Sequence, residues 1–147
     1  MKFKLSINSD KEEFVHAQLH HESLFSDQLK RFVQNSDNIQ SIIAFDKEGN
    51  LINLYFNEIA LVTIIENRIY ALTVNQEKLL LKERLYQVAE KLPNFFWKIN
   101  KSSIINRFEI KKFTVNHGAG INVVLKNGVS DYVSRRCFRK IRKELQK

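Results

Sequence analysis

Residues 97–110 read WKINKSSIINRFEI and join a polar, basic cluster to the apolar positions of a core strand. Ile104, Ile105 and Ile110 are β-branched residues of the kind that favours buried strands. The cluster that precedes them contains Lys98, Asn100, Lys101, Ser102 and Ser103. Because most of these side chains donate hydrogen bonds, the cluster is either a solvated loop or a surface that binds phosphates and base edges.

Charge is distributed unevenly along the 147-residue chain, whose formal net charge is +8. Residues 1–94 contain 11 Lys and Arg against 13 Asp and Glu, whereas residues 95–147 contain 13 against only 3. The positive excess therefore lies in the last third of the chain. This favours a polyanion-binding surface, and nucleic acid is the commonest polyanion that a cytosolic protein meets. The alternative is a basic face that only keeps the protein in solution.

The composition excludes several classes of protein. An apolar fraction of 44% supplies a core, and the length fits one domain, or one small domain with an N-terminal extension. A single cysteine excludes an intrachain disulfide and a multi-cysteine metal site, which fits a reducing cytosol. No apolar stretch approaches the ~20 residues of a membrane-spanning helix, and the first residues do not resemble a signal peptide. We therefore expect a cytoplasmic protein.

The first 38 residues predict a strand–helix extension ahead of the main domain. Residues 1–8 alternate apolar and polar side chains, as in a strand. From Ser9, an acidic stretch predicts the start of a helical pattern, in one or two pieces, which residues 35–38 end. We expect the extension to serve dimerisation or partner binding, or simply to cover an edge of the domain.

Residues 39–147 predict a mainly β domain of the α+β class, with one central helix over residues 76–91 and a short basic helix from Ser134. The pair Asn127–Gly128 predicts a type I′ turn. The expected strands are SIIAF (41–45), LINLYF (51–56), ALVTII (60–65), RIYALTV (68–74), FFWKI (95–99), SIIN (103–106), EIKKFTVN (109–116) and GINVVLK (120–126).

Catalytic and metal-binding patterns are weak in this sequence. His16 and His20 would stand one helical turn apart, but no carboxylate completes a metal motif, and a surface helix produces such spacing by chance. Cys137 has cationic neighbours but no histidine nearby in sequence, so we interpret it as a bystander thiol. The sequence predicts a protein that is not an enzyme and needs neither a metal nor a cofactor.

Two basic segments carry the candidate binding residues. Arg and Lys can bind guanine or phosphate, Asn can read adenine, and Ser can donate to phosphate oxygens. Because Ile141 and Leu145 should turn one side of the terminal helix inward, loops fit better than a helix-turn-helix as the reading elements. The candidates are Lys98, Asn100, Lys101 and Ser102 in the first segment, and Ser134, Arg135, Arg136, Arg139 and Lys140 in the second.

These segments resemble the LytTR DNA-binding domain. The family's pattern is an aromatic, a basic and an apolar residue, His-Arg-Ser, then two apolar residues and Asn, and residues 95–106 are similar to it. Ile110, the Asn-Gly hairpin of residues 125–128 and the Val-Ser-Arg stretch of residues 133–136 follow in the family's order. The resemblance extends over about residues 51–145.

The resemblance implies packed antiparallel sheets whose loops, rather than a recognition helix, enter DNA major grooves. It places Lys101 where the family has a base-contacting residue, and Ser102 where a side chain orients the loop or contacts phosphate. It matches Ser134 to a phosphate-contacting serine and Arg136 to a base-contacting arginine.

Further positions match the family less closely. Asn67 or Arg68, in a short hairpin turn, falls where the family places a third reading loop. Asn100 stands where His is usual, which leaves open the base that this position helps to read. We expect Asn106 to be a structural residue that caps the end of its strand.

The resemblance also implies a biological setting. Many family members carry a receiver domain, which residues 1–38 are too few to hold, so the chain resembles the stand-alone LytTR regulators of bacteria. We expect a homodimer on repeated promoter sites, paired with a small membrane protein that inhibits it. The prediction is a sequence-specific regulator of transcription that binds double-stranded DNA. The alternative is a protein-interaction module or regulatory subunit that binds an acidic protein. An RNA-binding domain is disfavoured, because no stacking platform of aromatics is evident.

Overall fold

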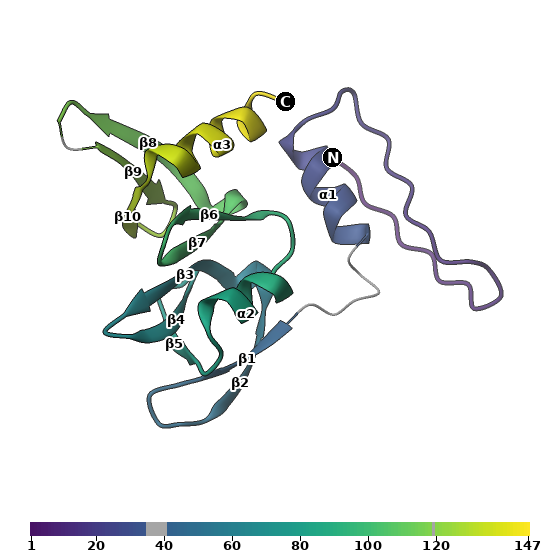
Figure 1. Ribbon diagram of the computed structural model, residues 1–147. Helices are drawn as coiled ribbons and strands as arrows, with labels where there is room; N and C mark the ends of the chain where they lie inside the picture. Colours follow the sequence, from purple (N-terminus) through teal and green to yellow (C-terminus); the bar gives the residue numbers. More distant parts are fainter. Residues whose placement is uncertain (35–40, 119) are drawn as a thin grey trace. The chain divides into compact units, whose positions relative to one another are not determined.

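The computed structural model describes residues 1–34, 41–118 and 120–147. The chain divides into two compact units, Met1–Ile39 and Gln40–Lys147 (Figure 1). The predicted boundary at residues 38 and 39, and the predicted end of the first helix, both fall within residues 35–40 and so lie outside the described residues.

The N-terminal unit contains one helix among its described residues, α1 (Leu24–Gln34). This helix begins where the Ser23 backbone N–H donates to Ser26 Oγ over 2.8 Å. The predicted strand over residues 1–8 is wrong, and so is a helix beginning near Ser9. An alternating pattern forms a strand only where a neighbour satisfies its backbone hydrogen bonds, and no described strand pairs with this segment.

The C-terminal unit is built on a seven-stranded antiparallel sheet (Figure 1). Its strands are β1 (Ser41–Phe45), β2 (Leu51–Tyr55), β3 (Ile59–Ile65), β4 (Arg68–Thr73), β5 (Lys78–Leu81), β6 (Phe96–Asn100) and β7 (Ser103–Asn106). Their order across the sheet is β2-β1-β5-β4-β3-β7-β6. The predicted strands are confirmed here, and β5 is an additional one.

β5 corrects the prediction of a helix over residues 76–91. Only Leu85–Lys91, which is α2, is helical, whereas β5 pairs with β4 and β1. Leu79 and Leu81 of this strand are buried, at the spacing of two that a strand gives. A run of leucines fits either a helix or a buried strand. Residues 78–81 form a strand because they lie between β1 and β4, whose backbone groups they hydrogen-bond.

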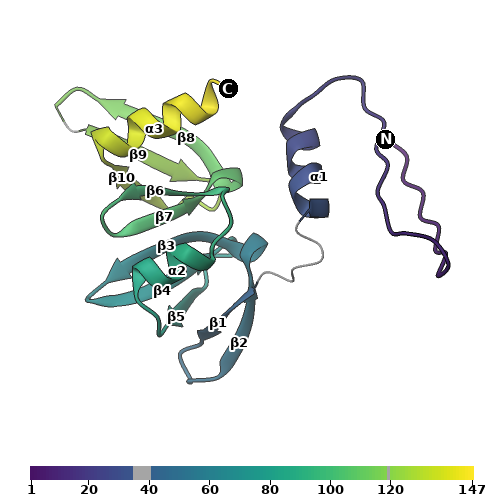
Figure 2. The same ribbon diagram turned by 45° about the vertical axis from the view of Figure 1, so that its right-hand side comes forward.

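A second, three-stranded antiparallel sheet contains β8 (Ile110–Asn116), β9 (Gly120–Leu125) and β10 (Ser130–Val133), in the order β10-β9-β8. Helix α3 (Arg135–Leu145) follows β10 directly and packs against this sheet (Figure 2). In α3, Ile141 is buried, and the Phe138 ring lies 5.4 Å from the Phe113 ring of β8 between centroids. The predicted terminal helix is confirmed, although Leu145, in its last turn, is 47% exposed.

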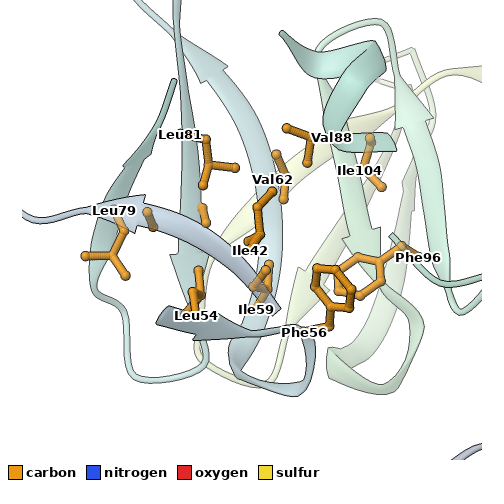
Figure 3. Close-up of a cluster of buried hydrophobic side chains, with 12 residues drawn as sticks. Ile42, Leu54, Phe56, Ile59, Val62, Leu79, Leu81, Val88, Phe96 and Ile104 are labelled. Carbon is orange, nitrogen blue, oxygen red and sulfur yellow. The ribbon is translucent and has the colours of Figure 1, made fainter. Parts of the chain in front are cut away.

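Two hydrophobic clusters bury the strands β3, β6 and β7 on both faces. The first includes Val62 and Ile104 together with Val88 of α2 (Figure 3). The second includes Leu61 and Ile105 together with side chains of β9, β10 and α3. Neighbouring residues of one strand thus enter different clusters. A slip of one residue would exchange the clusters, so the burial on both faces fixes the register of these strands.

The hairpin turns differ from the predicted types in one case. Asn127–Gly128 is not a type I′ turn, because Gly128 has φ +87° whereas Asn127 is not among the left-handed residues. The Asn127 side chain instead donates to the Thr73 carbonyl over 3.1 Å and accepts from the Val129 N–H over 3.0 Å, and these bonds set the loop. The primed geometry occurs between β3 and β4, where Glu66 and Asn67 have φ of 50° and 65°.

Candidate nucleic-acid interface

Lys101 is exposed to solvent in the turn between β6 and β7, and the buried side chain of Asn100 stabilises the backbone of this turn. Asn100 is only 2% exposed, and its Oδ1 accepts from the Ser102 N–H over 2.8 Å. Its Nδ2 donates to the Tyr132 carbonyl of β10 over 2.8 Å. Lys98, one strand period before Asn100, is exposed as well. The turn therefore places two cations at the surface while its own polar groups are satisfied internally.

The junction between β10 and α3 presents the second basic segment. Ser134 is the N-cap of α3, and its Oγ accepts from the Cys137 N–H over 3.2 Å. The hydroxyl proton of Ser134 remains available to donate to a phosphate oxygen. Arg135 and Arg136 are exposed in the first helical turn. Arg139 and Lys140 are exposed in the next.

Hydrogen bonds fix the distance between these two segments. The Ser134 N–H donates to the Ile99 carbonyl of β6 over 2.8 Å, beside the bond from Asn100 to β10. The Ser103 Oγ donates to Asp131 Oδ2 over 2.6 Å, and therefore accepts from Thr63 Oγ1 over 2.7 Å. The two sheets are thus joined at the base of both segments.

The turn between β3 and β4 lies at the same end of the larger sheet. The Ile64 N–H of β3 donates to the Ser102 carbonyl over 3.0 Å, which places the β6–β7 turn beside the end of β3. Asn67 and Arg68, at the β3–β4 turn, are exposed. Figure 1 shows both turns projecting on the same side of the unit. Three segments far apart in sequence are therefore neighbours, and we call them together the three-turn surface: residues 66–68, 98–102 and 134–136.

The structure brings most of the predicted site residues together and gives Asn100 a structural role. Lys98, Lys101, Arg68, Arg135 and Arg136 are all exposed on or beside the three-turn surface. Asn100 is buried at 2% exposure, and its Nδ2 and Oδ1 each already make a hydrogen bond within the protein. Ser102 and Ser134 are half-buried. Asn106 is buried, and its side chain accepts from the Phe108 N–H over 3.0 Å, as expected of a structural cap.

The residues that sequence reasoning missed are Thr63, Ser103 and Asp131, which connect the two sheets beneath the three-turn surface. Ser103 was part of the polar cluster, but its burial at 1% exposure depends on strand pairing. Asp131 carries a weak sequence signal, since it is one of only three acidic residues after position 94. Its partner is 28 residues away, a distance that sequence patterns do not bridge.

The described residues offer little to a metal ion. His16 and His20 lie in a segment without helical structure, so their spacing does not place them on one helix face. No group of three or more His, Cys, Asp or Glu side chains that could hold a metal occurs in the described part of the chain. In the same residues, no helix is long and apolar enough to cross a membrane.

Comparisons with known proteins identify the family. Residues 49–146 match the LytTr DNA-binding domain. Over 149 aligned positions, the chain is 31% identical to an uncharacterised HTH-type transcriptional regulator of Staphylococcus aureus strain NCTC 8325, with 99% of this chain and 98% of that protein covered. A regulator of the same description from the bovine S. aureus strain RF122 is 30% identical over the same shares of both chains.

The fold is similar to a solved structure as well. The LytTr DNA-binding domain of a Bacillus cereus response regulator superposes with a TM-score of 0.64 at 20% identity, covering 72% of this chain and 96% of that domain. The chain therefore belongs to the LytTR family of DNA-binding domains, and its class is a DNA-binding regulator rather than an enzyme. The resemblance noted in the sequence is confirmed.

The relatives' description as HTH-type does not correspond to a helix pair in the described part of this chain. After α2, five strands intervene before α3, so no two consecutive helices occur between residues 41 and 147. The exposed basic groups Arg68, Lys101, Arg135 and Arg136 instead lie at turns and in the first turn of α3. That loops rather than a helix-turn-helix carry the DNA contacts stays a prediction.

Proposed function

We propose that this protein is a sequence-specific transcription regulator that reads the major groove of double-stranded DNA with the three-turn surface. The observation that carries the proposal is the set of hydrogen bonds that holds three exposed polar segments at one end of the sheet. Phosphate contacts position a protein on DNA, and base-edge contacts supply the sequence information. A rigid arrangement of turns can combine both.

The residues divide between these two tasks. Lys101 and Arg136 are exposed and are proposed to contact base edges, as Lys and Arg do with guanine. Asn67 and Arg68 form the third reading turn. Phosphate contacts are assigned to Lys98, Ser102, Ser134, Arg135, Arg139 and Lys140.

Asn100 acts on DNA indirectly in this proposal. Its buried amide holds the Lys101 turn against β10, so it positions a contact residue. This replaces the expectation that Asn100 itself touches a base, because both ends of its amide are already hydrogen-bonded within the protein.

The biological setting is proposed from the family and from the N-terminal unit. The protein acts in the cytoplasm, as a homodimer on repeated promoter sites, and a small membrane protein restrains it. Exposed apolar side chains of α1, such as Phe25 and Phe32, give the N-terminal unit a surface for the second copy or for that inhibitor. The +10 balance of residues 95–147, with 13 basic against 3 acidic side chains, supports a DNA partner.

The test is selection of a duplex from a random-sequence library, followed by fluorescence anisotropy against a scrambled duplex at several salt concentrations. We expect a consensus with repeated half-sites and a preference of at least ~10³-fold over the scrambled duplex. Equal, steeply salt-dependent binding to both duplexes would contradict sequence-specific reading. Absence of binding to either duplex would favour the alternative, a module that binds an acidic protein.

A further inference from the structure

A second group of cations continues from the three-turn surface along the same end of the larger sheet. β5 ends at Leu81, and the pairing of Leu81 with Ile69 places the next residue, Lys82, beside Arg68. Arg68, Lys82 and Arg84 line one open hollow of about 330 Å³. All three side chains are exposed, and only Arg68 among them was a predicted site residue.

The acidic groups nearby leave most of this positive charge available. Glu83 lines the same hollow, but its carboxylate pairs with Lys91 of α2 at an Nζ–Oε1 distance of 2.6 Å. Glu66, which is exposed in the β3–β4 turn, precedes Asn67 and Arg68 of the hollow in the sequence. The Lys82 ammonium lies 4.0 Å from the centroid of the Phe45 ring, and this contact holds the amine in place without using its N–H donors.

The arrangement fits an extended polyanion better than a small anion. β7, β3, β4 and β5 are consecutive in the sheet, so the row from the β6–β7 turn to Lys82 spans three strand spacings, or ~14 Å. This length is nearly half of the ~34 Å rise of one DNA turn. A small anion would need donors that converge on one point, whereas Arg68 begins β4 and Lys82 and Arg84 follow the end of the neighbouring strand β5.

We propose that Lys82 and Arg84, which lie beside Arg68 of the reading turn, bind DNA phosphates on one flank of the recognised site. The inference rests on the proposed function, because these cations extend the three-turn surface away from α3. They touch no base edges, so they add affinity without adding sequence discrimination. The footprint therefore extends beyond the reading turns on the β5 side.

The experiment compares the full-length chain with the double variant Lys82→Gln/Arg84→Gln. The matched control is Lys111→Gln/Lys112→Gln, which removes the same charge from exposed positions near the start of β8. Each protein is titrated into the library-selected duplex and its scrambled counterpart by anisotropy at several salt concentrations, and its thermal melt confirms folding. The selected duplex is also trimmed from either end in separate series.

The Lys82/Arg84 variant should lower the log–log salt slope by about 2 and weaken both duplexes on the order of tenfold at 0.1 M salt, with an unchanged preference between them. Trimming one end of the duplex, and only that end, should make wild type and variant bind alike. An unchanged salt slope, or a loss of affinity equal to that of the control variant, would overturn this inference. If the wild type still discriminates between the duplexes, the proposed function is upheld. Wild-type binding that does not discriminate would overturn the proposed function instead, and failure to bind DNA would overturn both.

Discussion

A single buried amide shows how the fold supports the proposed DNA-binding surface. Asn100 satisfies the Ser102 N–H and the Tyr132 carbonyl at once, and both bonds are 2.8 Å long. Buried polar groups cost free energy when they lose a partner, so this residue is stabilising only while both partners stay in place. The Lys101 turn is therefore tied to β10, the strand that leads into Ser134.

Asn100→Ala tests this positioning role. The substitution leaves a buried N–H and a carbonyl without partners, so we expect a loss of ~1–3 kcal/mol in the free energy of unfolding. We also expect a smaller preference for the selected duplex, because the Lys101 turn loses its support. Urea unfolding and anisotropy provide the two measurements. The control is Asn53→Ala, an exposed site on β2, and equal stability of the two variants would contradict the positioning role.

Arg136→Ala and Lys140→Ala test the division between base and phosphate contacts. The first should cost ~1–3 kcal/mol of binding free energy and relax discrimination at one base position. The second should weaken all duplexes about equally, since a phosphate contact carries no sequence information. A panel of single-base variants of the selected duplex, titrated with both proteins, distinguishes the outcomes. Similar profiles for the two variants would argue against separate roles.

At this scale the sequence revealed exposed groups better than buried ones. Lys101, an exposed turn residue, and Ser134, a half-buried N-cap, could be named as candidates because a polar residue in a turn or before a helix has few structural alternatives. The link from Thr63 through Ser103 to Asp131 could not, because it joins residues 40 and 28 positions apart. The burial of Asn100 is hidden for the same reason, since β10 covers it from a distant part of the chain.

Among the elements, β7 has the greatest influence on the site. It lies between β3 and β6 and is buried along its whole length. Its residues alternate between the two hydrophobic clusters, so it connects the larger sheet to the smaller sheet and α3. Any change in its register would move the Lys101 turn relative to Arg136.

Ile105→Ala measures this contribution. The side chain is fully buried, and its truncation should cost ~2–5 kcal/mol in the free energy of unfolding through lost burial and a cavity. Ile43→Ala, at a position on β1 that is 54% exposed, is the matched control and should cost far less. Urea denaturation of both variants checks the difference. Similar losses would mean that the second cluster does not stabilise the fold as described.

Glu109, in the short 3₁₀ helix η2 (Arg107–Glu109), gives the fold a pH dependence. Burial raises the pKa of this carboxyl above its usual 4.5, while the nearby charge of Lys126 opposes the shift. The folded state therefore holds the proton more tightly, and this stabilisation is lost as the pH rises from below 4.5 through the raised value. Glu109→Gln should remove that loss. The difference in Tm between the variant and wild type should therefore increase as the pH rises through this window. A constant difference in Tm would contradict the assignment.

The sequence was most informative for elements whose apolar residues follow only one secondary-structure pattern. β1, β3 and β4 follow their β-branched runs directly. Residues 78–81 were misread because four consecutive side chains, Lys and three Leu, fit a helix and a buried strand equally well. The alternation of residues 1–8 was a true pattern without a partner strand, and pairing cannot be read from the segment itself.

On the scale of the whole molecule, the charge distribution was readable from the sequence and the assembly of the turns was not. The basic excess after residue 94 favours an anion-binding surface over a face that only keeps the protein in solution. The closeness of the β3–β4 and β6–β7 turns follows from the sheet order, which places β3 next to β7. That order depends on long-range pairing and leaves no local signal in the sequence.

The proposed homodimer is tested through the N-terminal unit. Phe32 of α1 is 70% exposed, and Phe32→Asp should weaken self-association if this unit supplies the dimer surface. Tyr86→Asp on α2, where the side chain is 60% exposed, is the control and should leave association unchanged. Sedimentation velocity over a concentration series measures both. Equal association of the two variants and wild type would place the dimer surface elsewhere.

The most direct test of the central claim is to map the bound DNA by NMR. Backbone amide signals of the ¹⁵N-labelled full-length chain are compared before and after addition of the library-selected duplex. We predict that the largest changes fall together in residues 66–68, 98–102 and 134–136. Hydrogen bonds from Ile64 to Ser102, from Asn100 to Tyr132 and from Ser134 to Ile99 bring these three segments to one end of the sheet. Changes confined to α1 or to the β8–β9 hairpin, with these three segments unaffected, would contradict the claim.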